Sequence, residues 1–173
     1  MQIVDCSKER HAQAILDIFN HAILNSTALY DYKPREATSM VGWFDTKSRN
    51  NFPVIGIEDD DGKLLGFASY GTFRAWPAYK YTVEHSIYVD HECRGVGLGK
   101  ILLNALINEA IERDVHTMVG GIDLTNQASI ALHEQLGFRQ VGIIKEAAYK
   151  FRRWLDLAFY QRILATPLEP NEE

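Results

Sequence analysis

The sequence predicts an α/β (α+β) fold in which helices flank a mixed, mostly antiparallel central sheet. Apolar residues recur at helical spacing near the N-terminus and again over residues 98–113, which indicates amphipathic helices. Two apolar runs flank the turn Asp59-Asp60-Asp61-Gly62, a strong signal for a β-hairpin. From there to the C-terminus, strand-like and helix-like stretches alternate, which is typical of helices packed on a sheet.

The elements are expected in the order strand, two helices, three strands, helix, strand, helix and two strands. Ser7 is expected to cap the first helix. The second helix is predicted over residues 35–47, with Met40, Val41 and Phe44 on its inner face. The other elements are predicted at residues 1–5, 8–24, 53–58, 63–71, 81–89, 98–113, 117–123, 126–136, 138–144 and 150–164.

Length and composition favour one domain. With 173 residues and 46% hydrophobic content, the chain can fill one core but is short for two. We therefore expect a single domain over residues 1–165, followed by a Pro- and Glu-rich tail over residues 166–173.

Charge and segment patterns exclude several classes of partner. The net charge is −5, and the basic residues are scattered, which argues against nucleic acid and anionic membrane as partners. No apolar run has the length of a transmembrane helix, and the early charged residues leave no signal-peptide core. Cys6 and Cys93 show no metal-ligand spacing and are expected to be free thiols in the cytoplasm.

A glycine-rich corner lies between a strand-like run and a helix within residues 83–100. Gly95, Gly97 and Gly99 lack side chains, so consecutive backbone N–H groups can converge on an anion. The helix that follows adds the positive end of its dipole. This corner predicts a phosphate site.

Spacing excludes two common kinds of phosphate site. A P-loop requires glycine and a hydroxyl residue where this chain has Arg94 and Ile101. A dinucleotide fingerprint requires a third glycine where this chain has Lys100 or Leu102. The remaining pattern is Arg94-x-x-Gly97-x-Gly99.

This loop and several other motifs together resemble the GCN5-related N-acetyltransferases (GNAT), and among them the phosphinothricin and methionine sulfoximine acetyltransferases. The further motifs are Gly71-x-Phe73-Arg74, Tyr79-x-Tyr81 through Val89, Gly121-Ile122-Asp123, Asn126 through His133, Leu136-Gly137-Phe138, Lys150-Phe151 and Arg153-Trp154-Leu155-Asp156. They span most of residues 3–160 in the family's order. The resemblance implies a GNAT fold and acetyl-CoA as cosubstrate, with no metal.

The resemblance also implies how acetyl-CoA is held. The loop would bind the pyrophosphate, while strand backbone and one asparagine side chain would bind the pantetheine arm. The expected cofactor-binding residues are Ile87, Tyr88, Val89, Arg94, Gly95, Val96, Gly97, Leu98, Gly99, Lys100 and Asn126.

Glu84 is the candidate general base. Successive strand residues point to opposite faces, so Glu84 shares its face with polar Thr82 and Ser86, and His85 lies on the other face. Glu84 is also about 16 Å from Val89 at ~3.3 Å per residue, so an arm running back from the phosphate corner would end near it. The alternative for Glu84 is an ordinary surface carboxylate.

His133 is the candidate general acid for the departing thiolate, a role that only the resemblance implies. A structural histidine is the alternative. For the acceptor, Arg74 can bind an amino-acid carboxylate through its planar guanidinium. The full set expected to contact the acceptor is Phe73, Arg74, Trp76, Tyr79, Glu84, His85, Ser86 and Lys150.

The expected function is acetyl-CoA-dependent acetylation of the α-amine of phosphinothricin, methionine sulfoximine or methionine sulfone, by direct transfer with a general base. A protein or peptide N-terminal acetyltransferase and a non-catalytic CoA-binding regulatory module are the alternatives. In the family the acceptor pocket lies near a dimer interface, which suggests a homodimer.

Overall fold

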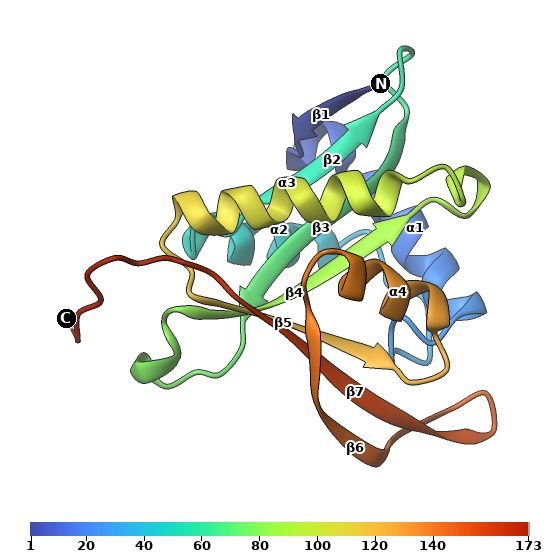
Figure 1. The fold of residues 1–173 in the computed structure, drawn as a ribbon. Coiled ribbons are helices and arrows are strands. Elements are labelled where there is room, and N and C mark those ends of the chain that lie inside the picture. The colour runs from blue at the N-terminus through green and yellow to red at the C-terminus, as the bar shows by residue number, and fades with distance from the viewer. Residues whose placement is uncertain (173) are drawn as a thin grey trace. The chain divides into compact units, whose positions relative to one another are not determined.

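The computed structural model describes residues 1–172, which form seven strands, four α-helices and two short 3₁₀ helices (Figure 1). In chain order the elements are β1 (Gln2–Asp5), α1 (Lys8–Asn25), α2 (Ser39–Arg49), β2 (Val54–Glu58), β3 (Leu64–Thr72), η1 (Pro77–Tyr79), β4 (Thr82–Val89), η2 (His91–Cys93), α3 (Leu98–Glu112), β5 (Thr117–Asp123), α4 (Gln127–Gln135), β6 (Arg139–Lys150) and β7 (Arg153–Ile163). The strand order is β1-β2-β3-β4-β5-β7-β6, and β4 pairs with β5 in parallel. This mixed sheet with helices confirms the predicted fold class.

The residues group into two compact units. The first contains Met1–Ser69 and Ile87–Leu103, and the second contains Tyr70–Ser86 and the chain from Asn104 onward. β3, β4 and α3 contribute residues to both units. The single domain expected over residues 1–165 stays a prediction. No helix among the described residues is both long and apolar enough to cross a membrane.

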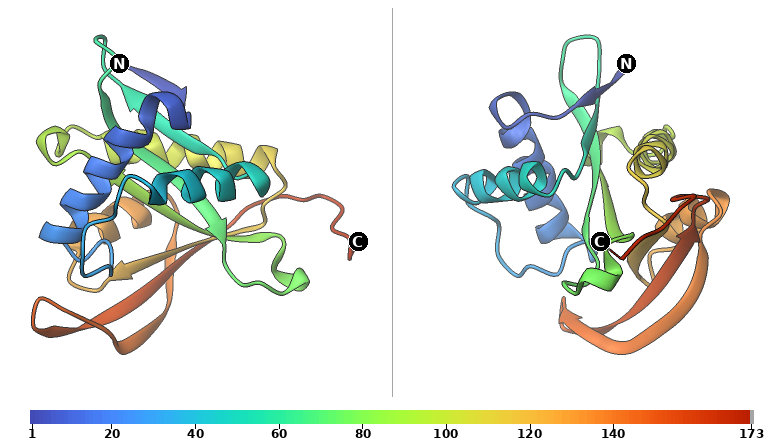
Figure 2. Two further views of the ribbon diagram at one scale, coloured as in Figure 1. Left: turned by 180° about the vertical axis from the view of Figure 1, so that it is seen from behind. Right: turned by 90° about the vertical axis from the view of Figure 1, so that its left-hand side faces the viewer.

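In the first unit, α1 and α2 cover one face of β2 and β3 (Figure 2). Helical spacing places Ile15 and Phe19 of α1 on the buried side, where they share a core with Phe44 of α2 and Phe67 of β3. Phe19 meets Phe67 edge to face, with ring centroids 5.1 Å apart. As predicted, Ser7 caps α1, because its Oγ accepts a hydrogen bond from the backbone N–H three residues on.

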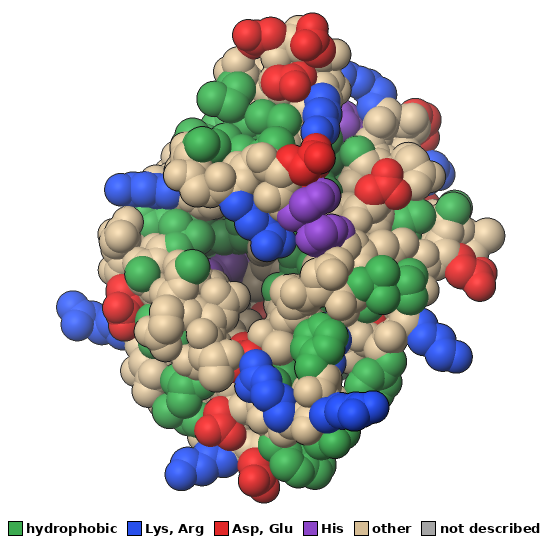
Figure 3. Space-filling view, turned by 90° about the vertical axis from the view of Figure 1, so that its right-hand side faces the viewer, with side chains coloured by type: hydrophobic (Ala, Val, Ile, Leu, Met, Phe, Trp, Pro, Cys, Tyr) green, Lys and Arg blue, Asp and Glu red, His purple; other side chains and the backbone are tan. Residues whose placement is uncertain are grey.

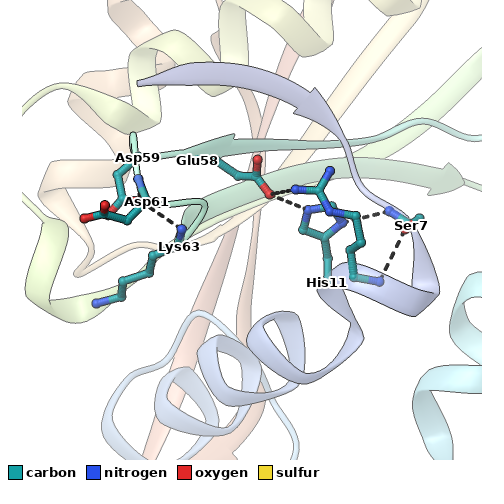
Figure 4. A network of polar contacts seen from close by, with 7 residues as sticks. Ser7, His11, Glu58, Asp59, Asp61 and Lys63 are labelled. Carbon is teal, nitrogen blue, oxygen red and sulfur yellow. Dashed lines mark hydrogen bonds and ion pairs between the residues drawn. The ribbon is translucent and has the colours of Figure 1, made fainter.

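A buried carboxylate links the start of α1 to β2 (Figure 4). Glu58 is 1% exposed and lies 2.8 Å from both His11 Nε2 and Arg10 Nη2. The Ser7 N–H can only donate, so His11 Nδ1 accepts at 2.9 Å and Nε2–H donates to Glu58. The His11 hydrogen bond, with help from the Arg10 charge, holds the pKa of Glu58 below its usual range.

In the second unit, β5 pairs with β7 along its whole length, and β7 pairs with β6 in a long hairpin (Figure 1). Leu106 and Ala110 of α3, Met118 of β5 and Leu155 of β7 are fully buried. The apolar face predicted for α3 is therefore confirmed.

The second helix differs from its prediction. It begins at Ser39, because the preceding residues form turns in which Ser39 N–H donates to Glu36 O and Met40 N–H donates to Ala37 O. Met40 is buried as expected, but Val41 is 49% exposed, so its assignment to the inner face was wrong.

The last hairpin also differs. Lys150 ends β6 and is not the first residue of the last strand, and β6 runs well past the predicted end at residue 144. The turn consists of Phe151 and Arg152, whose φ angles are 50° and 61°. Bulky residues rarely adopt this conformation, so the sequence carried no turn signal at this point.

Candidate active site

Glu84 lies on the open face of β4. Its neighbours Val83 and His85 are 3% and 6% exposed, whereas Glu84 itself is exposed. The alternation predicted for this strand is therefore confirmed around Glu84.

The surroundings of the Glu84 carboxyl favour its neutral form. Partial burial raises its pKa, and the positive charge of Arg74 partly opposes this. On the neighbouring strand, a Cβ added to Gly121 would lie only 3.3 Å from Glu84 Oε1. A carboxylate with a raised pKa next to bare backbone is a stronger proton acceptor than an ordinary carboxylate.

Arg74 belongs to a small aromatic cluster between β3 and β4. Its guanidinium carbon lies 5.3 Å from the ring centroid of Phe73, and that ring meets Tyr79 edge to face at 5.9 Å. Trp76, predicted to line the same pocket, is 69% exposed. The structure thus brings Arg74, Phe73 and Tyr79 together and places Arg74 within electrostatic reach of Glu84.

His85 and His133 form a buried pair. Their Nε2 atoms are 2.9 Å apart, and His133 Nδ1 lies 2.7 Å from the Ser129 carbonyl oxygen. A carbonyl only accepts, so His133 carries its hydrogen on Nδ1 and accepts at Nε2 from the Nε2–H of His85. His85 Nδ1 then has no hydrogen, and it is buried without a hydrogen-bond partner among the described residues.

Both rings are held neutral. Burial, and to a smaller extent the charge that His133 would carry when protonated, lower the pKa of His85 to about 3, against the opposing effect of the Val119 backbone. Burial also lowers the pKa of His133. The histidine pair fits beside β5 because Gly120 has no side chain. A Cβ at this position would lie only 2.9 Å from His85 Cε1. The side chain of His85 is thus directed away from the face that carries Glu84.

The glycine-rich corner adopts the conformation that its sequence requires. Gly95 and Gly97 have φ angles of 83° and 87°, which L-residues rarely adopt. An added Cβ at either would meet nothing within 4 Å, so the backbone is open to a ligand. The Gly97 carbonyl accepts from Lys100 N–H and Ile101 N–H and so begins α3. The third glycine of the motif, Gly99, lies within the first turn of α3 and not in the loop.

Two features suit an extended ligand arm. The parallel register between β4 and β5 runs from Thr82 to Glu84 and ends there. Asn126 caps α4, and its Oδ1 accepts from Ser129 N–H at 3.2 Å. No described residue accepts from its side-chain NH₂ group, which leaves two donors for a carbonyl oxygen.

Three further predicted residues are less accessible. Lys150 is 5% exposed, and its Nζ lies 5.0 Å from the Phe151 ring centroid. Ser86 and Ile87 are half-buried in β4. Their parts in binding stay predictions.

Sequence reasoning missed the two histidine pairs, His85 with His133 and His21 with His91. Each joins positions far apart in the chain, so no local pattern indicates it. One available signal was the consecutive Gly120 and Gly121, because glycine inside a strand marks a close approach of other groups.

The sequence over residues 15–138 matches the family described as the acetyltransferase (GNAT) family. A curated relative, the L-methionine sulfoximine/L-methionine sulfone acetyltransferase of Pseudomonas aeruginosa, is 44% identical over 147 residues, which is 85% of this chain and 86% of that protein. These matches confirm the resemblance inferred from the motifs.

Two solved structures extend the comparison. One from Acinetobacter baylyi ADP1 is 59% identical with a TM-score of 0.98, and the match covers 99% of this chain and 97% of that one. A phosphinothricin acetyltransferase from Sinorhizobium meliloti, solved in complex with acetyl-CoA, is 34% identical with a TM-score of 0.92, and the match covers 98% of this chain and 91% of that one. The fold of this chain is therefore that of known acetyltransferases.

Proposed function

Since the chain belongs to the acetyltransferase (GNAT) family, we propose that it transfers the acetyl group of acetyl-CoA to the α-amine of methionine sulfoximine, methionine sulfone or phosphinothricin. The observation that carries the proposal is the partly desolvated carboxyl of Glu84 within electrostatic reach of Arg74. The names of the relatives in Pseudomonas and Sinorhizobium support this class of acceptor.

In the proposed reaction, the acceptor carboxylate binds the guanidinium of Arg74. Glu84 takes a proton from the acceptor ammonium, and the nitrogen lone pair then attacks the acetyl carbonyl carbon. The C–N bond forms as the C–S bond breaks, the nitrogen loses its second proton, and the departing CoA thiolate takes up one proton to become the thiol. The raised pKa of Glu84 makes it a stronger base than an ordinary carboxylate.

Acetyl-CoA would lie along β4. The end of the β4–β5 register at Glu84 supports pairing of the pantetheine amides with the backbone of residues 87–89. The N–H groups of residues 94–100 and the α3 dipole would hold the pyrophosphate. The Asn126 NH₂ group would donate to the arm. Val89 and Glu84 are about 16 Å apart along the strand, and this length would match the distance between the pyrophosphate and the acetyl group of the bound acetyl-CoA.

The role of His133 as general acid stays a prediction. Both of its ring nitrogens are engaged, one by Ser129 and one by His85, so proton donation to the thiolate requires an exchange of the His85 hydrogen bond. If His133 is the acid, His133→Phe lowers kcat while the Kd for acetyl-CoA stays the same. An undiminished kcat in this variant assigns the thiolate proton to another donor or to water.

We also propose that the enzyme is a cytoplasmic homodimer. β6 is an edge strand of 12 residues, and nearly all of it is exposed, which is a feature that favours pairing with another chain. Its apolar side chains Val141, Ile143 and Ile144 are 57%, 41% and 51% exposed. A second copy of the chain would cover them. Two free cysteines suit a reducing compartment.

The function is tested by thiol release from acetyl-CoA with the three proposed acceptors, ordinary amino acids and a peptide with an N-terminal alanine. We expect turnover with at least one of the three analogues. Turnover with the peptide alone would instead assign N-terminal protein acetylation, and binding of acetyl-CoA without any turnover would assign a regulatory module.

The base is tested by Glu84→Gln, which keeps the size of the side chain and removes its basicity. We expect kcat to fall about 100-fold or more while the Kd for acetyl-CoA stays the same. Glu112→Gln, at the end of α3, is the matched control and retains full activity. An undiminished kcat in Glu84→Gln would remove Glu84 from the mechanism.

A further inference from the structure

A stacked pair of histidines lies next to the glycine-rich corner. His21 comes from α1 and His91 from η2, and their ring centroids are 3.8 Å apart with an interplanar angle of 11°. Figure 3, in which histidine side chains are purple, shows such a pair beside a cationic side chain on the surface. The stack thus joins a helix of the first unit to the segment that leads into Arg94 and the loop.

The stack has ring nitrogens that can take up protons. His91 Nδ1 lies 3.1 Å from Asp90 Oδ1, a contact that becomes an ion pair when the ring carries a proton. The His91 side chain is 48% exposed. No hydrogen bond to another described residue occupies the ring nitrogens of His21.

The corner already carries a small excess of positive charge. Lys63 Nζ lies 3.7 Å from Asp90 Oδ2 and 3.2 Å from Glu92 Oε2. With Arg94 and Lys100 there are three cations and two carboxylates. Every proton on His21 or His91 therefore adds to this positive charge.

Without a bound anion, the corner resists this protonation. Partial burial and the charges of His91 and Arg94 lower the pKa of His21, and Asp90 opposes them. A phosphate placed against the two rings and Arg94 would offset the repulsion. Protonation of the stack and binding of a phosphate must then strengthen each other, because linkage is reciprocal.

We propose that His21 and His91 form, together with Arg94, a subsite for a phosphate group of the cofactor that takes up a proton when the cofactor binds. The inference rests on the proposed function, because it takes acetyl-CoA as the ligand. It adds two residues to the binding site and gives affinity a dependence on pH. The phosphate is either the pyrophosphate or the 3′-phosphate of the adenosine.

The test is calorimetric titration of the full chain with CoA at pH 6, 7 and 8, in buffers of different ionisation enthalpy so that proton uptake is counted. We expect binding to tighten about tenfold from pH 8 to pH 6. In the double variant His21→Gln/His91→Gln we expect proton uptake to fall and the dependence on pH to flatten. Titration of the ligand's own phosphate is common to both proteins and cancels in this comparison.

Two further variants sharpen the test. His91→Lys supplies a permanent cation and is expected to bind CoA at pH 8 as tightly as the unaltered protein does at pH 6. His116→Gln, which alters a histidine of the second unit, is the matched control and keeps the full dependence on pH. Thermal unfolding of each variant verifies that it is folded.

The source of the phosphate is found with 3′-dephospho-CoA. Loss of the histidine-dependent effect with this ligand assigns the subsite to the 3′-phosphate, and its retention assigns the subsite to the pyrophosphate. CoA binding with the same dependence on pH in the double variant overturns the inference and leaves the proposed function intact. Failure to bind acetyl-CoA or CoA at every pH overturns both.

Discussion

At the scale of single residues, adjacent side chains on β4 have opposite environments. Glu84 is exposed beside Gly121, and its pKa is raised, whereas His85 is buried beside Gly120, and its pKa is lowered to about 3. Both shifts favour the neutral form, and both have desolvation as their main cause. Proton affinity at this site is thus set by burial more than by charge pairs.

The acid limb of the rate profile reports on Glu84. A base works only when deprotonated, so a raised pKa places the loss of activity at a higher pH than for an ordinary glutamate. Arg74→Gln removes the positive charge that opposes this shift, so its acid limb moves to still higher pH. The measurement is kcat/KM against pH, and a limb that moves to lower pH in this variant would contradict the assignment.

Gly120→Ala tests the space that the histidine pair requires. The new methyl group would lie 2.9 Å from His85 Cε1 and 3.2 Å from His133 Nε2, so we expect a loss of about 1–3 kcal/mol in the free energy of unfolding. Gly142→Ala is the matched control, because a Cβ there would meet nothing within 4 Å, and it is expected to be neutral or slightly stabilising. Urea unfolding gives both values.

Sequence patterns predicted which face of β4 each residue occupies, but not which distant residues it contacts. Period-two alternation sufficed to put Glu84 and His85 on opposite faces of β4, because that depends only on strand geometry. It could not indicate that His85 meets His133, because 48 residues separate them. The stack of His21 on His91 likewise depends on the packing of α1, which no local pattern specifies.

At the scale of elements, the His85–His133 hydrogen bond ties α4 to β4. The bond requires that one of the two Nε2 atoms carries no hydrogen, since two charged rings would each present a hydrogen to the other. The unfolded chain can protonate both near pH 6.5, and the folded chain does so only at lower pH. Below pH 6.5 the unfolded chain therefore binds more protons than the folded chain does. As a result, the free energy of unfolding decreases as the pH is lowered.

We accordingly expect stability to be full above pH 6.5 and to decline as the pH falls toward 3. Urea midpoints at pH 7 and pH 5 measure the decline, which should be smaller in His85→Leu/His133→Leu than in His116→Gln. NMR titration of the histidine rings in the unaltered protein gives an independent check. Two ordinary titrations near pH 6.5 for His85 and His133 would show that the pair is not held neutral.

The two hairpins show which turns the sequence reveals. Gly62 has a φ of 82°, and the Asp-Gly signal predicted the β2–β3 turn correctly. The β6–β7 turn uses Phe151 and Arg152 at positive φ without glycine, so the strand boundaries there were wrong. Its conformation is set by the pairing of the two long strands, which a local pattern does not contain.

At the scale of the whole molecule, the exposed apolar side chains of β6 are the feature that an isolated chain does not explain. Val141 lies at an irregularity of the β6–β7 register and Ile143 lies two residues further along this edge strand, and both side chains are exposed. Isolated exposed apolar residues are ordinary, but an unpaired edge that carries several of them favours self-association.

Ile143→Lys tests the proposed homodimer. A buried lysine in the interface would oppose association, so we expect a dimer of the unaltered chain to become monomeric in sedimentation equilibrium. Ile111→Lys is the control, because Ile111 is 39% exposed on α3, and it should remain dimeric. A monomeric unaltered chain at micromolar concentration would contradict the proposal directly.

The two consecutive glycines of β5 make this strand sensitive to insertions and deletions. Gly120 gives room to the histidine pair and Gly121 to the Glu84 carboxyl, on opposite faces of one strand. An insertion or deletion of one residue in β5 would exchange these faces and set Val119 or Ile122 against one of the two groups. Along this strand, a change in length is therefore expected to disturb both groups at once, whereas a substitution at Gly120 or Gly121 disturbs one of them.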